Sequence, residues 1–373
     1  MERIAHSNGD GDIHADTHLG AVGVDVAAPR PLLRATGVTK HFPVKTKGFG
    51  LQRTRTLRAV DNVDLDIPRG TTVGLVGESG SGKSTLGRMI TRLTDVTAGE
   101  IELDGIDIAH IRGSQLRQLR RRVQMVFQDP YSSFDPSSAM VATVLEPVDA
   151  FERLSGKVRR ARVQELFELV GLNPTLVDRY PRQLSGGQLQ RAAVARALST
   201  NPDLVVLDEP VSALDVSTQA QVVNLLADLQ ERVLASYLFI GHDLSVVRHV
   251  SSRIAVMYLG RIVEEGPTDQ VYRSPAHPYT AALLSAVPVP DPTRQRARTR
   301  LELRGEIPSP LDPPSGCHFR TRCQWAMPIC AAETPAEFVT PGGVRTYCHL
   351  HTSGPELMGA SVTTLQSTTA ATN

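Results

Sequence analysis

The amino-acid sequence predicts an α/β protein built on a parallel β-sheet. From Leu32 to about Tyr272, short apolar runs alternate with segments of helical pattern. The runs "TTVGLVG", "DLVVLDE" and "SYLFIGHD" each end in polar residues, and a helical segment follows each of them. Continuous apolar runs of this length are typical of strands that are buried on both faces, as the strands of parallel sheets are.

The overall composition is that of a globular protein and argues against several functional classes. The chain has 373 residues, enough for two domains, and 41% of them are hydrophobic. Its 40 Lys and Arg residues are balanced by 39 Asp and Glu residues, so we expect no nucleic-acid partner. No apolar run approaches the ~20 residues that span a bilayer, and the N-terminus lacks the apolar core of a signal peptide. We therefore expect a cytoplasmic chain that acts on a membrane only through partners.

We expect both ends of the chain to be disordered. Residues 1–30 are polar, rich in Gly, His and Asp, and without periodicity. Within them, "NGDGDIHADTH" is similar to a calcium loop but lacks the glycine at the sixth position and the glutamate at the twelfth. Residues 353–373 are rich in Ser and Thr, which favours a loose tail.

Between these ends, the composition separates a main domain from a C-terminal appendix. We predict the main domain at residues 31–266, with a helical insert at about 129–182 that contains "KVRRARVQELFELVGL". Ten of the 25 prolines lie between Pro267 and Pro314. Because proline breaks helices, we predict a loop-rich C-terminal domain at residues 267–352. The basic stretch "VKTKGFGLQRTRTLR" could contact anionic lipid, but we favour a solvated insertion.

The segment "GESGSGKST" predicts a phosphate-binding loop. It matches G-x-x-x-x-G-K-[ST] and lies between the apolar run "TTVGLVG" and the helical segment "TLGRMITRL". Glycines let backbone N–H groups converge on phosphate oxygens, Lys83 reaches the β- and γ-phosphates, and the Ser84 hydroxyl can hold Mg²⁺. The alternative is a Gly-rich turn, but a chance match in this chain is on the order of one in a hundred. The predicted nucleotide-binding residues are Gly77, Ser79, Gly80, Ser81, Gly82, Lys83, Ser84 and Thr85.

Acidic residues and a histidine follow two further predicted strands. In "LVVLDEP", Asp208 suits a Mg²⁺ ligand that acts through water, and Glu209 stands where a general base would orient the attacking water. His242 ends the third strand. Because ligands bind at the carboxyl ends of parallel strands, we expect these side chains to face the same crevice as the phosphate loop.

The stretch "LSGGQLQR", from Leu184 to Arg191, predicts a second anion site. Ser185 can cap the following helix, and Gly186 and Gly187 expose N–H groups at its positive end. One nucleotide does not need two such helix ends from one subunit, so we expect this one to serve a nucleotide held by another subunit. The alternative is a helix start with flexible glycines, which the motif alone does not exclude.

Taken together, these motifs resemble those of ABC-transporter nucleotide-binding subunits in order and spacing. Within that group, the chain looks most like the ATPase subunits of oligopeptide/dipeptide importers. The similarity extends from about Leu32 to Cys348 and is carried by "VFQDPYSSFDP", "RYPRQLSGGQLQR", "DEPVSALDVSTQAQVVNLL", "HPYTAALLSAVPVPDP" and "GEIPSPLDPPSGCHFRTRC". The resemblance implies a P-loop ATPase core with a parallel sheet, an antiparallel β subdomain and a helical insert, plus a small Pro/Cys-rich C-terminal appendix.

The resemblance also implies roles for individual residues. Phe42 would stack on adenine, Gln128 would sense Mg²⁺ and the γ-phosphate, and the loop after Gln128 would meet the membrane subunits. Asp215 would lie across a dimer interface. Gly241 departs from the family, which more often has alanine or threonine there, but we expect an active site because His242 is present. The implied catalytic residues are Lys83, Gln128, Glu209 and His242, the Mg²⁺ ligands are Ser84, Gln128 and Asp208, and the residues that grip the partner's ATP are Ser185, Gly186, Gly187 and Gln188.

By the same resemblance, the chain is an ATP-hydrolysing motor subunit at the cytoplasmic face of a membrane. Its partners would be a second, related ATPase subunit in a head-to-tail dimer, two membrane permease subunits and an extracytoplasmic peptide-binding protein. Alternatives are a related nickel importer, a soluble ABC ATPase of translation or DNA repair, and an iron–sulfur electron carrier. The soluble class usually has tandem cassettes or long coiled coils, whereas this chain has one phosphate loop, one LSGGQ and no sustained heptads.

All four cysteines lie in the C-terminal appendix, spaced Cys317-x5-Cys323-x6-Cys330 with seventeen residues before Cys348. Disulfides are disfavoured in a reducing cytoplasm, and the clustering argues against independent buried thiols. Four thiolates suit zinc or an iron–sulfur cluster, and the spacing leaves these two open. The family resemblance favours a structural 4Fe-4S cluster, with Zn²⁺ as the alternative.

Overall fold

The computed structural model describes residues 30–48, 51–288, 301, 303, 305–354 and 357–365. The described residues from Pro31 onward form one compact unit. The disordered tail predicted for residues 1–30 lies, except for Arg30, outside the described residues.

The centre of the fold is an eight-stranded sheet with the order β11-β12-β10-β9-β3-β8-β7-β6. Strands β6, β7, β8, β3 and β9 pair in parallel, which confirms the predicted parallel sheet, and β10, β12 and β11 continue it antiparallel. The three apolar runs singled out in the sequence are β3, β7 and β8, which are neighbours in this sheet. The strand bounds are β3 Thr72–Val76, β6 Val123–Val126, β7 Leu204–Asp208, β8 Ser236–Gly241, β9 Arg253–Tyr258, β10 Arg261–Pro267, β11 Phe338–Val339 and β12 Arg345–Thr346.

The central strands are apolar throughout because each face of the sheet packs against a different core. In β7, Val205 and Leu207 belong to one hydrophobic cluster, while Leu204 and Val206 belong to the other. Successive side chains of a strand point to opposite faces, so a strand covered on both sides needs an apolar residue at every position.

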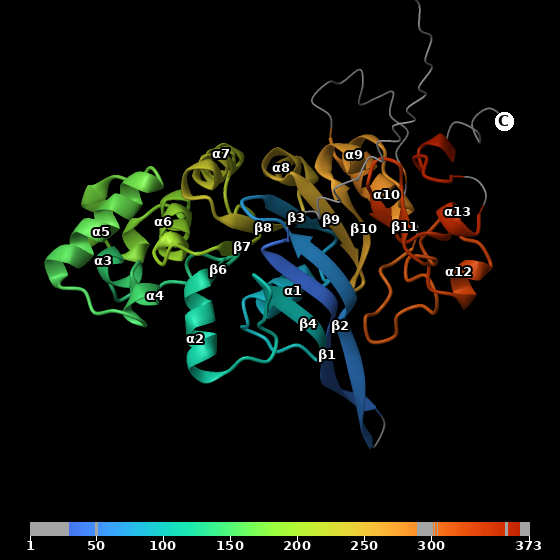
Figure 1. Cartoon of the computed structure of the whole chain (residues 1–373), viewed down its shortest axis with the longest axis horizontal. Helices are drawn as coiled ribbons and strands as arrows, with labels where there is room; N and C mark the ends of the chain where they lie inside the picture. The colour runs from blue at the N-terminus through green and yellow to red at the C-terminus, as the bar shows by residue number, and fades with distance from the viewer. Residues whose placement is uncertain are drawn as a thin grey trace, which may run out of the picture. The chain divides into compact units, whose positions relative to one another are not determined.

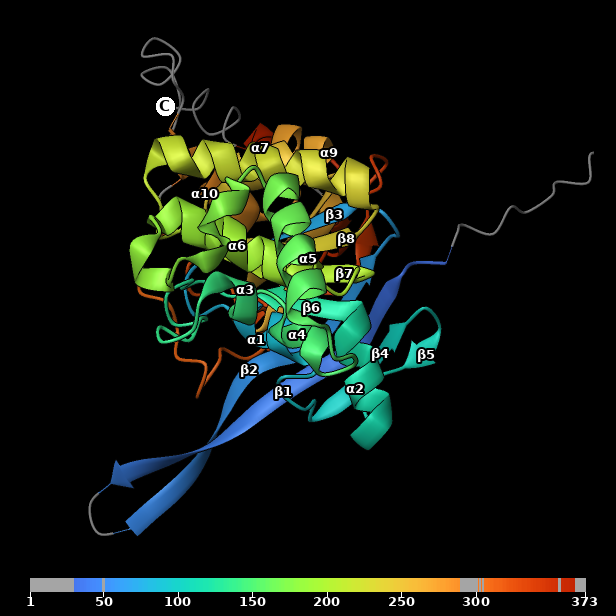
Figure 2. The ribbon, with the colours of Figure 1, turned by 90° about the vertical axis from the view of Figure 1, so that its left-hand side faces the viewer.

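One of these cores lies under an antiparallel sheet with the order β2-β1-β4-β5. The strands are β1 Leu33–Gly48, β2 Leu51–Ile67, β4 Ala98–Leu103 and β5 Ile106–Asp107. This sheet is the antiparallel β subdomain that the family resemblance implies. Strands β1 and β2 pair as far as Gly48 and Leu51, so they form a long hairpin that extends away from the core (Figure 2).

Helices cover both faces of the central sheet (Figure 1). Helix α1 packs on the face that carries the antiparallel sheet, whereas α6, α7 and α8 contribute buried residues to the other core. The helices that surround the site are α1 Lys83–Ile90, α2 Gly113–Arg122, α3 Met140–Thr143, α4 Glu146–Asp149, α5 Gly156–Leu169, η1 Pro174–Asp178, η2 Pro181–Gln183, α6 Gly186–Leu198, α7 Val216–Val233 and α8 Leu244–Val250. Helices α3 to η2 occupy the segment predicted as a helical insert.

The C-terminal appendix has a small core of its own. Its helices among the described residues are α9 Thr268–Arg273, α10 Pro278–Ala286, α12 Ile329–Ala332 and α13 His349–Thr352, and β12 joins the central sheet beside β10. The buried residues of this third cluster are Ala281, Ala282, Leu301, Cys348, Leu350, Leu357 and Val362.

Part of the segment predicted as a disordered C-terminal tail, residues 353–373, is packed in the structure. Val362 is fully buried, and its backbone N–H donates to the Pro275 carbonyl at 3.0 Å. The Ser/Thr-rich composition concealed two apolar residues, Leu357 and Val362, that complete the third cluster.

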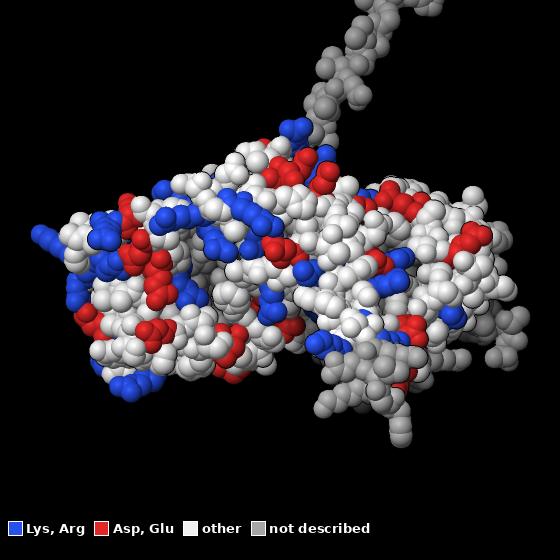
Figure 3. All heavy atoms as spheres, turned by 90° about the horizontal axis from the view of Figure 1, so that it is seen from below, with Lys and Arg blue, Asp and Glu red and all other residues white. Residues whose placement is uncertain are grey.

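Charged residues of both signs are interspersed over the face seen from below (Figure 3). This distribution agrees with the near balance of charge in the sequence. Among the described residues, we find no helix with the length and apolar character that crossing a membrane requires.

Candidate nucleotide-binding site

The phosphate loop connects the end of β3 to the start of α1, as the motif predicts. Gly77 and Gly82 adopt φ values of 153° and 109°. A Cβ atom at Gly77 would lie 2.1 Å from the Met257 carbonyl oxygen, and one at Gly82 would lie 2.2 Å from the Ala59 carbonyl oxygen. Both the backbone conformation and the close approach of neighbouring backbone therefore require glycine.

Lys83 begins α1 and is folded over the phosphate loop. Its Nζ donates to the carbonyl oxygens of Gly77 and Glu78, both at 2.9 Å. Burial lowers the pKa of the Lys83 ammonium, against the attraction of Glu209, Asp208 and Glu78. A buried ammonium held by two neutral carbonyls is well placed to bind an anion such as a phosphate group.

Ser84, at the start of α1, contacts Asp208 at the end of β7. The Ser84 Oγ donates to Asp208 Oδ1 at 2.8 Å. Asp208 ends β7 and is 3% exposed, and this burial raises the pKa of its carboxyl group. A hydroxyl and a carboxylate at this position form a pair of hard oxygen donors.

Glu209 connects three of the predicted catalytic side chains. Its Oε2 accepts a hydrogen bond from Gln128 Nε2 at 2.8 Å and lies 3.6 Å from His242 Nδ1. Glu209 itself has a φ of 47°, an unfavourable value for a residue with a side chain. Strained backbone of this kind is found preferentially at functional sites, where surrounding contacts maintain it.

These side chains line one cavity of about 660 Å³. The predicted residues that the structure brings together there are Ser79, Gly80, Gly82, Lys83, Ser84, Thr85, Gln128, Glu209 and His242. Gly77, Ser81 and Asp208 do not line this cavity. Gly77 and Ser81 belong to the loop that forms the cavity, and the Asp208 carboxylate accepts from Ser84.

The LSGGQ residues lie elsewhere on the chain, at the start of α6. Ser185 and Gln188 form a capping box, in which Ser185 Oγ accepts from Gln188 N and Gln188 Oε1 accepts from Ser185 N. This confirms the predicted cap. Ser185, Gly186, Gly187 and Gln188 are not among the described residues that line the 660 Å³ cavity. Within one chain, the two predicted phosphate-binding elements are therefore separate.

Asp215 precedes α7 and caps it. Its carboxylate accepts hydrogen bonds from Ser217 Oγ at 2.6 Å, from Thr218 Oγ1 at 2.8 Å and from the Thr218 backbone N–H at 3.0 Å. The Ser217 and Thr218 hydrogen bonds hold the pKa of the Asp215 carboxyl well below its usual range. The predicted role of Asp215 at a dimer interface stays a prediction.

Phe42 lies on β1 opposite Leu57 of β2. Leu57, but not Phe42, lines the cavity, and the Lys40 ammonium lies 5.0 Å from the centre of the Phe42 ring. Adenine stacking by Phe42 stays a prediction.

Sequence reasoning missed several residues of this site. Leu57, Ala59 and Pro310 also line the cavity, and Pro310 comes from the C-terminal appendix. The Pro310 carbonyl accepts from the Arg58 N–H at 3.1 Å, which attaches the appendix to β2. A proline in a loop carries no signal for such a contact in the sequence.

The four cysteines are free thiols. The Cys317 N–H donates to the Cys330 carbonyl at 2.8 Å. Burial raises the pKa of the Cys348 thiol, and the nearby Cys323, Cys317 and Cys330 raise it further. Burial likewise raises the pKa of Cys323, to about 12. Among the described residues, however, no group of three or more His, Cys, Asp or Glu side chains has the arrangement of a metal site.

A parallel sheet with a glycine-rich phosphate loop at the end of β3, and with Asp208 and Glu209 at the end of β7, two strands further along the sheet, defines a P-loop ATPase. Comparison with known proteins makes this class more specific. The family model described as "ABC transporter" matches residues 60–212, and "Oligopeptide/dipeptide transporter, C-terminal region" matches residues 263–330.

Curated relatives cover most of the chain. It is 49% identical over 319 residues to the probable peptide ABC transporter ATP-binding protein y4tS of Sinorhizobium fredii, covering 86% of this chain and 90% of that protein. It is 46% identical over 324 residues to the oligopeptide transport ATP-binding protein AppF of Bacillus subtilis, covering 86% and 97%. Among solved structures, the ATP-binding cassette MJ0796, a dimer bound to ADP and Pi, matches with a TM-score of 0.56 and 32% identity, covering 63% of this chain and 98% of that one. The chain therefore belongs to the ATP-binding proteins of ABC transporters, in the oligopeptide/dipeptide branch.

Proposed function

We propose that the protein is the ATP-hydrolysing motor subunit of a peptide importer. The observation that carries this proposal is the convergence of Lys83, Ser84, Gln128, Glu209 and His242 on one cavity. The matched oligopeptide/dipeptide transporter region at residues 263–330 and the peptide-transport relatives support the substrate class.

In this proposal, the chain's own side chains position ATP and the attacking water. Lys83 binds the β- and γ-phosphates, and Glu209 acts as the general base. Gln128, bonded to Glu209, and His242, beside it, orient the water and contact the γ-phosphate. Phosphoryl transfer of this kind depends on positioning and on charge stabilisation rather than on covalent chemistry.

The oxygen donors around Ser84 fit Mg²⁺. Ser84 Oγ and Asp208 Oδ1 already lie 2.8 Å apart, and Gln128 adds an amide oxygen at the same cavity. Hydroxyl, carboxylate and amide oxygens are the ligand types that this cation prefers. The ion, when bound with ATP, would neutralise negative charge on the phosphate oxygens.

The separation of the LSGGQ helix from the cavity supports a head-to-tail dimer. Ser185 is exposed and lies outside the cavity of its own chain. We propose that Ser185, Gly186, Gly187, Gln188 and Asp215 complete the ATP site of a partner, and that the partner is a second, related ATPase subunit. The similarity to MJ0796, a dimeric ATP-binding cassette bound to ADP and Pi, supports this arrangement.

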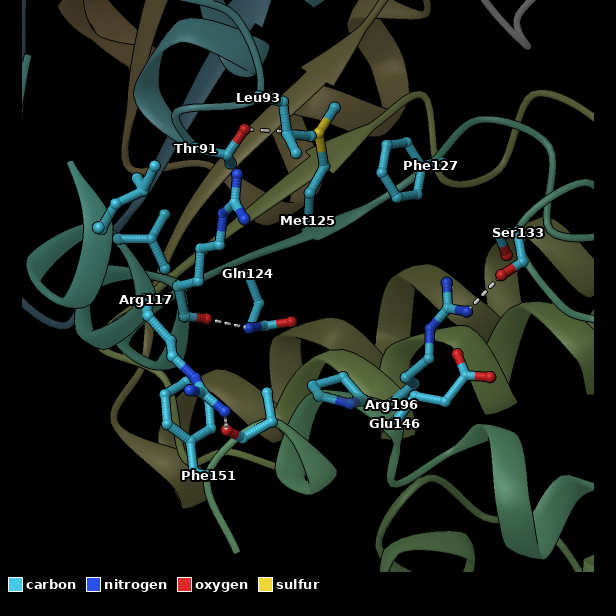
Figure 4. A pocket seen from close by; sticks show the side chains of 16 residues that line it. Thr91, Leu93, Arg117, Gln124, Met125, Phe127, Ser133, Glu146, Phe151 and Arg196 are labelled. Carbon is cyan, nitrogen blue, oxygen red and sulfur yellow. Dashed lines mark hydrogen bonds between the residues drawn. The ribbon is translucent and has the colours of Figure 1, made fainter.

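A second cavity, of about 600 Å³, suits the permease subunits (Figure 4). It lies among α2, β6 and α4, in the region of the helical insert. Its lining combines apolar side chains, among them Leu116, Met125 and Phe127, with three cations and one carboxylate, which are Arg117, Arg120, Arg196 and Glu146. We propose that it receives a short cytoplasmic segment of a permease subunit with an apolar face and an acidic residue.

The lining of this cavity is connected to the predicted catalytic residues by adjacent positions in the sequence. Phe127 lines it, and the next residue, Gln128, donates to Glu209. On its other side, Ser133 accepts a hydrogen bond from Arg196, whose guanidinium lies 4.4 Å from the Phe134 ring centre. A permease segment that displaced Phe127 would therefore move Gln128 relative to Glu209.

We also propose that Cys317, Cys323, Cys330 and Cys348 hold a 4Fe-4S cluster, with Zn²⁺ as the alternative. Their confinement to one short region supports this, since four thiolates form a full ligand set. In the structure the four thiols are free, and they do not have the arrangement of a metal site. Binding a cluster or Zn²⁺ would therefore require the four side chains to rearrange. No step of ATP hydrolysis depends on this group.

The complete importer would place this chain at the cytoplasmic face of a membrane, bound to two permease subunits that receive peptide from an extracytoplasmic binding protein. The test is reconstitution of the chain with its partner ATPase and permeases in liposomes. We expect ATP-dependent uptake of labelled peptide that stops when Glu209→Gln replaces the wild-type chain. Uptake that persists with this variant, or an assembled complex that hydrolyses ATP without moving peptides, would contradict the proposal.

A further inference from the structure

Arg322, in the C-terminal appendix, contacts the phosphate loop with its guanidinium group. Arg322 Nη1 donates to Glu78 Oε2 at 2.6 Å, and Arg322 Nη2 donates to Glu78 Oε1 at 3.1 Å. Glu78 is the second residue of the phosphate loop, whereas Arg322 lies 244 positions further on and directly precedes Cys323. Two parallel hydrogen bonds between a guanidinium and a carboxylate determine orientation as well as distance.

Glu78 is held at its backbone as well as at its side chain. Its N–H donates to the hydroxyl of Tyr279, on α10, at 2.8 Å. Its carbonyl accepts from Lys83 Nζ at 2.9 Å and from the Ser81 N–H at 3.2 Å. Two of the residues that hold Glu78, Tyr279 and Arg322, therefore belong to the appendix, and two belong to the loop.

Arg322 is itself fixed by its surroundings. Its side chain is 6% exposed and that of Glu78 is 24% exposed. The guanidinium lies 5.8 Å from the ring centre of Tyr258, and the Tyr258 ring packs on Tyr279 at 4.7 Å and on Phe319 at 5.3 Å. Removing one member of such a buried pair leaves an uncompensated charge, which is strongly unfavourable.

We propose that Arg322 is a positioning residue for ATP binding, which holds the phosphate loop in its binding conformation through Glu78. The inference rests on the proposed function of the 660 Å³ cavity as an ATP site. The loop's N–H groups must converge on the phosphates, and Glu78 lies at the start of that loop. Arg322 also neutralises a carboxylate that would otherwise repel the phosphates.

The two effects of Arg322 predict different results for Glu78→Gln. If Arg322 only neutralised a charge, Glu78→Gln would make the site more positive and tighten ATP binding. If Arg322 positions the loop, Glu78→Gln breaks the bidentate pair and weakens ATP binding, as Arg322→Gln does.

The experiment measures the Kd of Mg-ATP for the full-length chain, for four variants of the Arg322–Glu78 pair and for one control variant. We expect Arg322→Gln to raise the Kd at least about fivefold, the size of a typical coupling between sites. Glu78→Gln should raise it too, and the double variant should bind no more weakly than Arg322→Gln alone. Arg322→Lys, which keeps the charge without the fork, should bind with intermediate affinity and provides the measurement if Arg322→Gln does not fold.

Arg320→Gln is the matched control. Arg320 lies on the same turn but donates to the Ser315 carbonyl at 3.0 Å rather than to the phosphate loop. The Kd of Mg-ATP for Arg320→Gln should therefore equal that of the wild type. Tighter binding by Glu78→Gln, a wild-type Kd in the double variant, or a wild-type Kd in both Arg322 variants would overturn the inference. Failure of the wild-type chain to bind ATP would instead remove the proposed function, and a chain that binds ATP but transports no peptide would leave this inference intact.

Discussion

Gln128 Nε2 donates a hydrogen bond of 2.8 Å to Glu209 Oε2 across 81 positions of sequence. The two residues meet because β6 and β7 are adjacent parallel strands, and each residue follows the carboxyl end of its strand. The same contact joins the side chain proposed as general base to the segment that lines the proposed permease cavity.

The first prediction concerns Glu209 as the general base. Glu209→Gln should retain Mg-ATP binding, because Lys83 and the phosphate loop are unchanged. Turnover should fall about 10²- to 10⁴-fold, the usual contribution of a general base. Phosphate release and ATP binding, measured on the same preparation, check this. Glu231→Gln, at an exposed position on α7, should leave both unchanged, and wild-type turnover by Glu209→Gln would remove Glu209 as the base.

The second prediction concerns the shared ATP site. Ser185→Ala should cost about 1 kcal/mol of stability as a lost helix cap, leave ATP binding by the isolated chain unchanged, and abolish ATP-induced association with the partner ATPase. Size-exclusion chromatography with and without ATP checks this. Asn173→Ala, which removes the cap of η1, is the matched control and should associate normally. A monomer that hydrolyses ATP at full rate, with or without Ser185, would refute the shared site.

The third prediction concerns the 600 Å³ cavity. Arg120→Glu reverses a charge at its lining and should prevent co-purification with the permease subunits, since the proposed permease segment carries an acidic residue. The Kd of ATP should not change, because Arg120 does not line the nucleotide cavity. Arg232→Glu, at an exposed position near the end of α7, should co-purify normally. Normal assembly of the Arg120→Glu subunit would argue against this cavity as the permease site.

The fourth prediction concerns Glu264, a fully buried carboxyl group on β10. Burial raises its pKa to about 7, although the Ala276 and His277 N–H groups donate to it at 2.7 and 2.8 Å. Because the folded state holds this proton more tightly than the unfolded state, the stability that Glu264 contributes is fully present below the unfolded pKa of 4.5 and is lost as pH rises towards about 7.

Ionisation of Glu264 should lower the free energy of unfolding by on the order of 3 kcal/mol across this pH range. Glu264→Gln does not ionise, so the free energy of unfolding should depend less steeply on pH across this window, even if the variant is less stable overall. Denaturant unfolding at several pH values checks the slope. An unchanged slope in Glu264→Gln would assign the pH dependence to other groups, and Glu231→Gln is the surface control.

The fifth prediction concerns the cysteines. Protein purified without oxygen should contain about four iron atoms and four acid-labile sulfides per chain and absorb visible light, as expected for a 4Fe-4S cluster. The Cys330→Ser variant should lose the iron and sulfide content and the visible absorption. A colourless preparation with stoichiometric zinc would replace the cluster by the zinc alternative, and a preparation without either metal would leave four structural thiols.

The sequence by itself determined the elements whose signal is local. The phosphate loop is recognisable because Gly77 and Gly82 adopt backbone conformations that favour glycine. The strands β3, β7 and β8 are recognisable because burial on both faces requires successive apolar residues. The Ser185 cap is likewise encoded within four residues. The family resemblance added the antiparallel β subdomain, which no local pattern had predicted.

Only the tertiary structure decided which distant residues meet. Pro310 at the cavity wall, Val362 in the third cluster and Arg322 on Glu78 leave no pattern in the sequence, because each contact joins segments far apart along the chain. Their partners are selected by how whole elements pack, and packing depends on the summed burial and charge pairing of the folded chain rather than on the spacing of neighbouring residues.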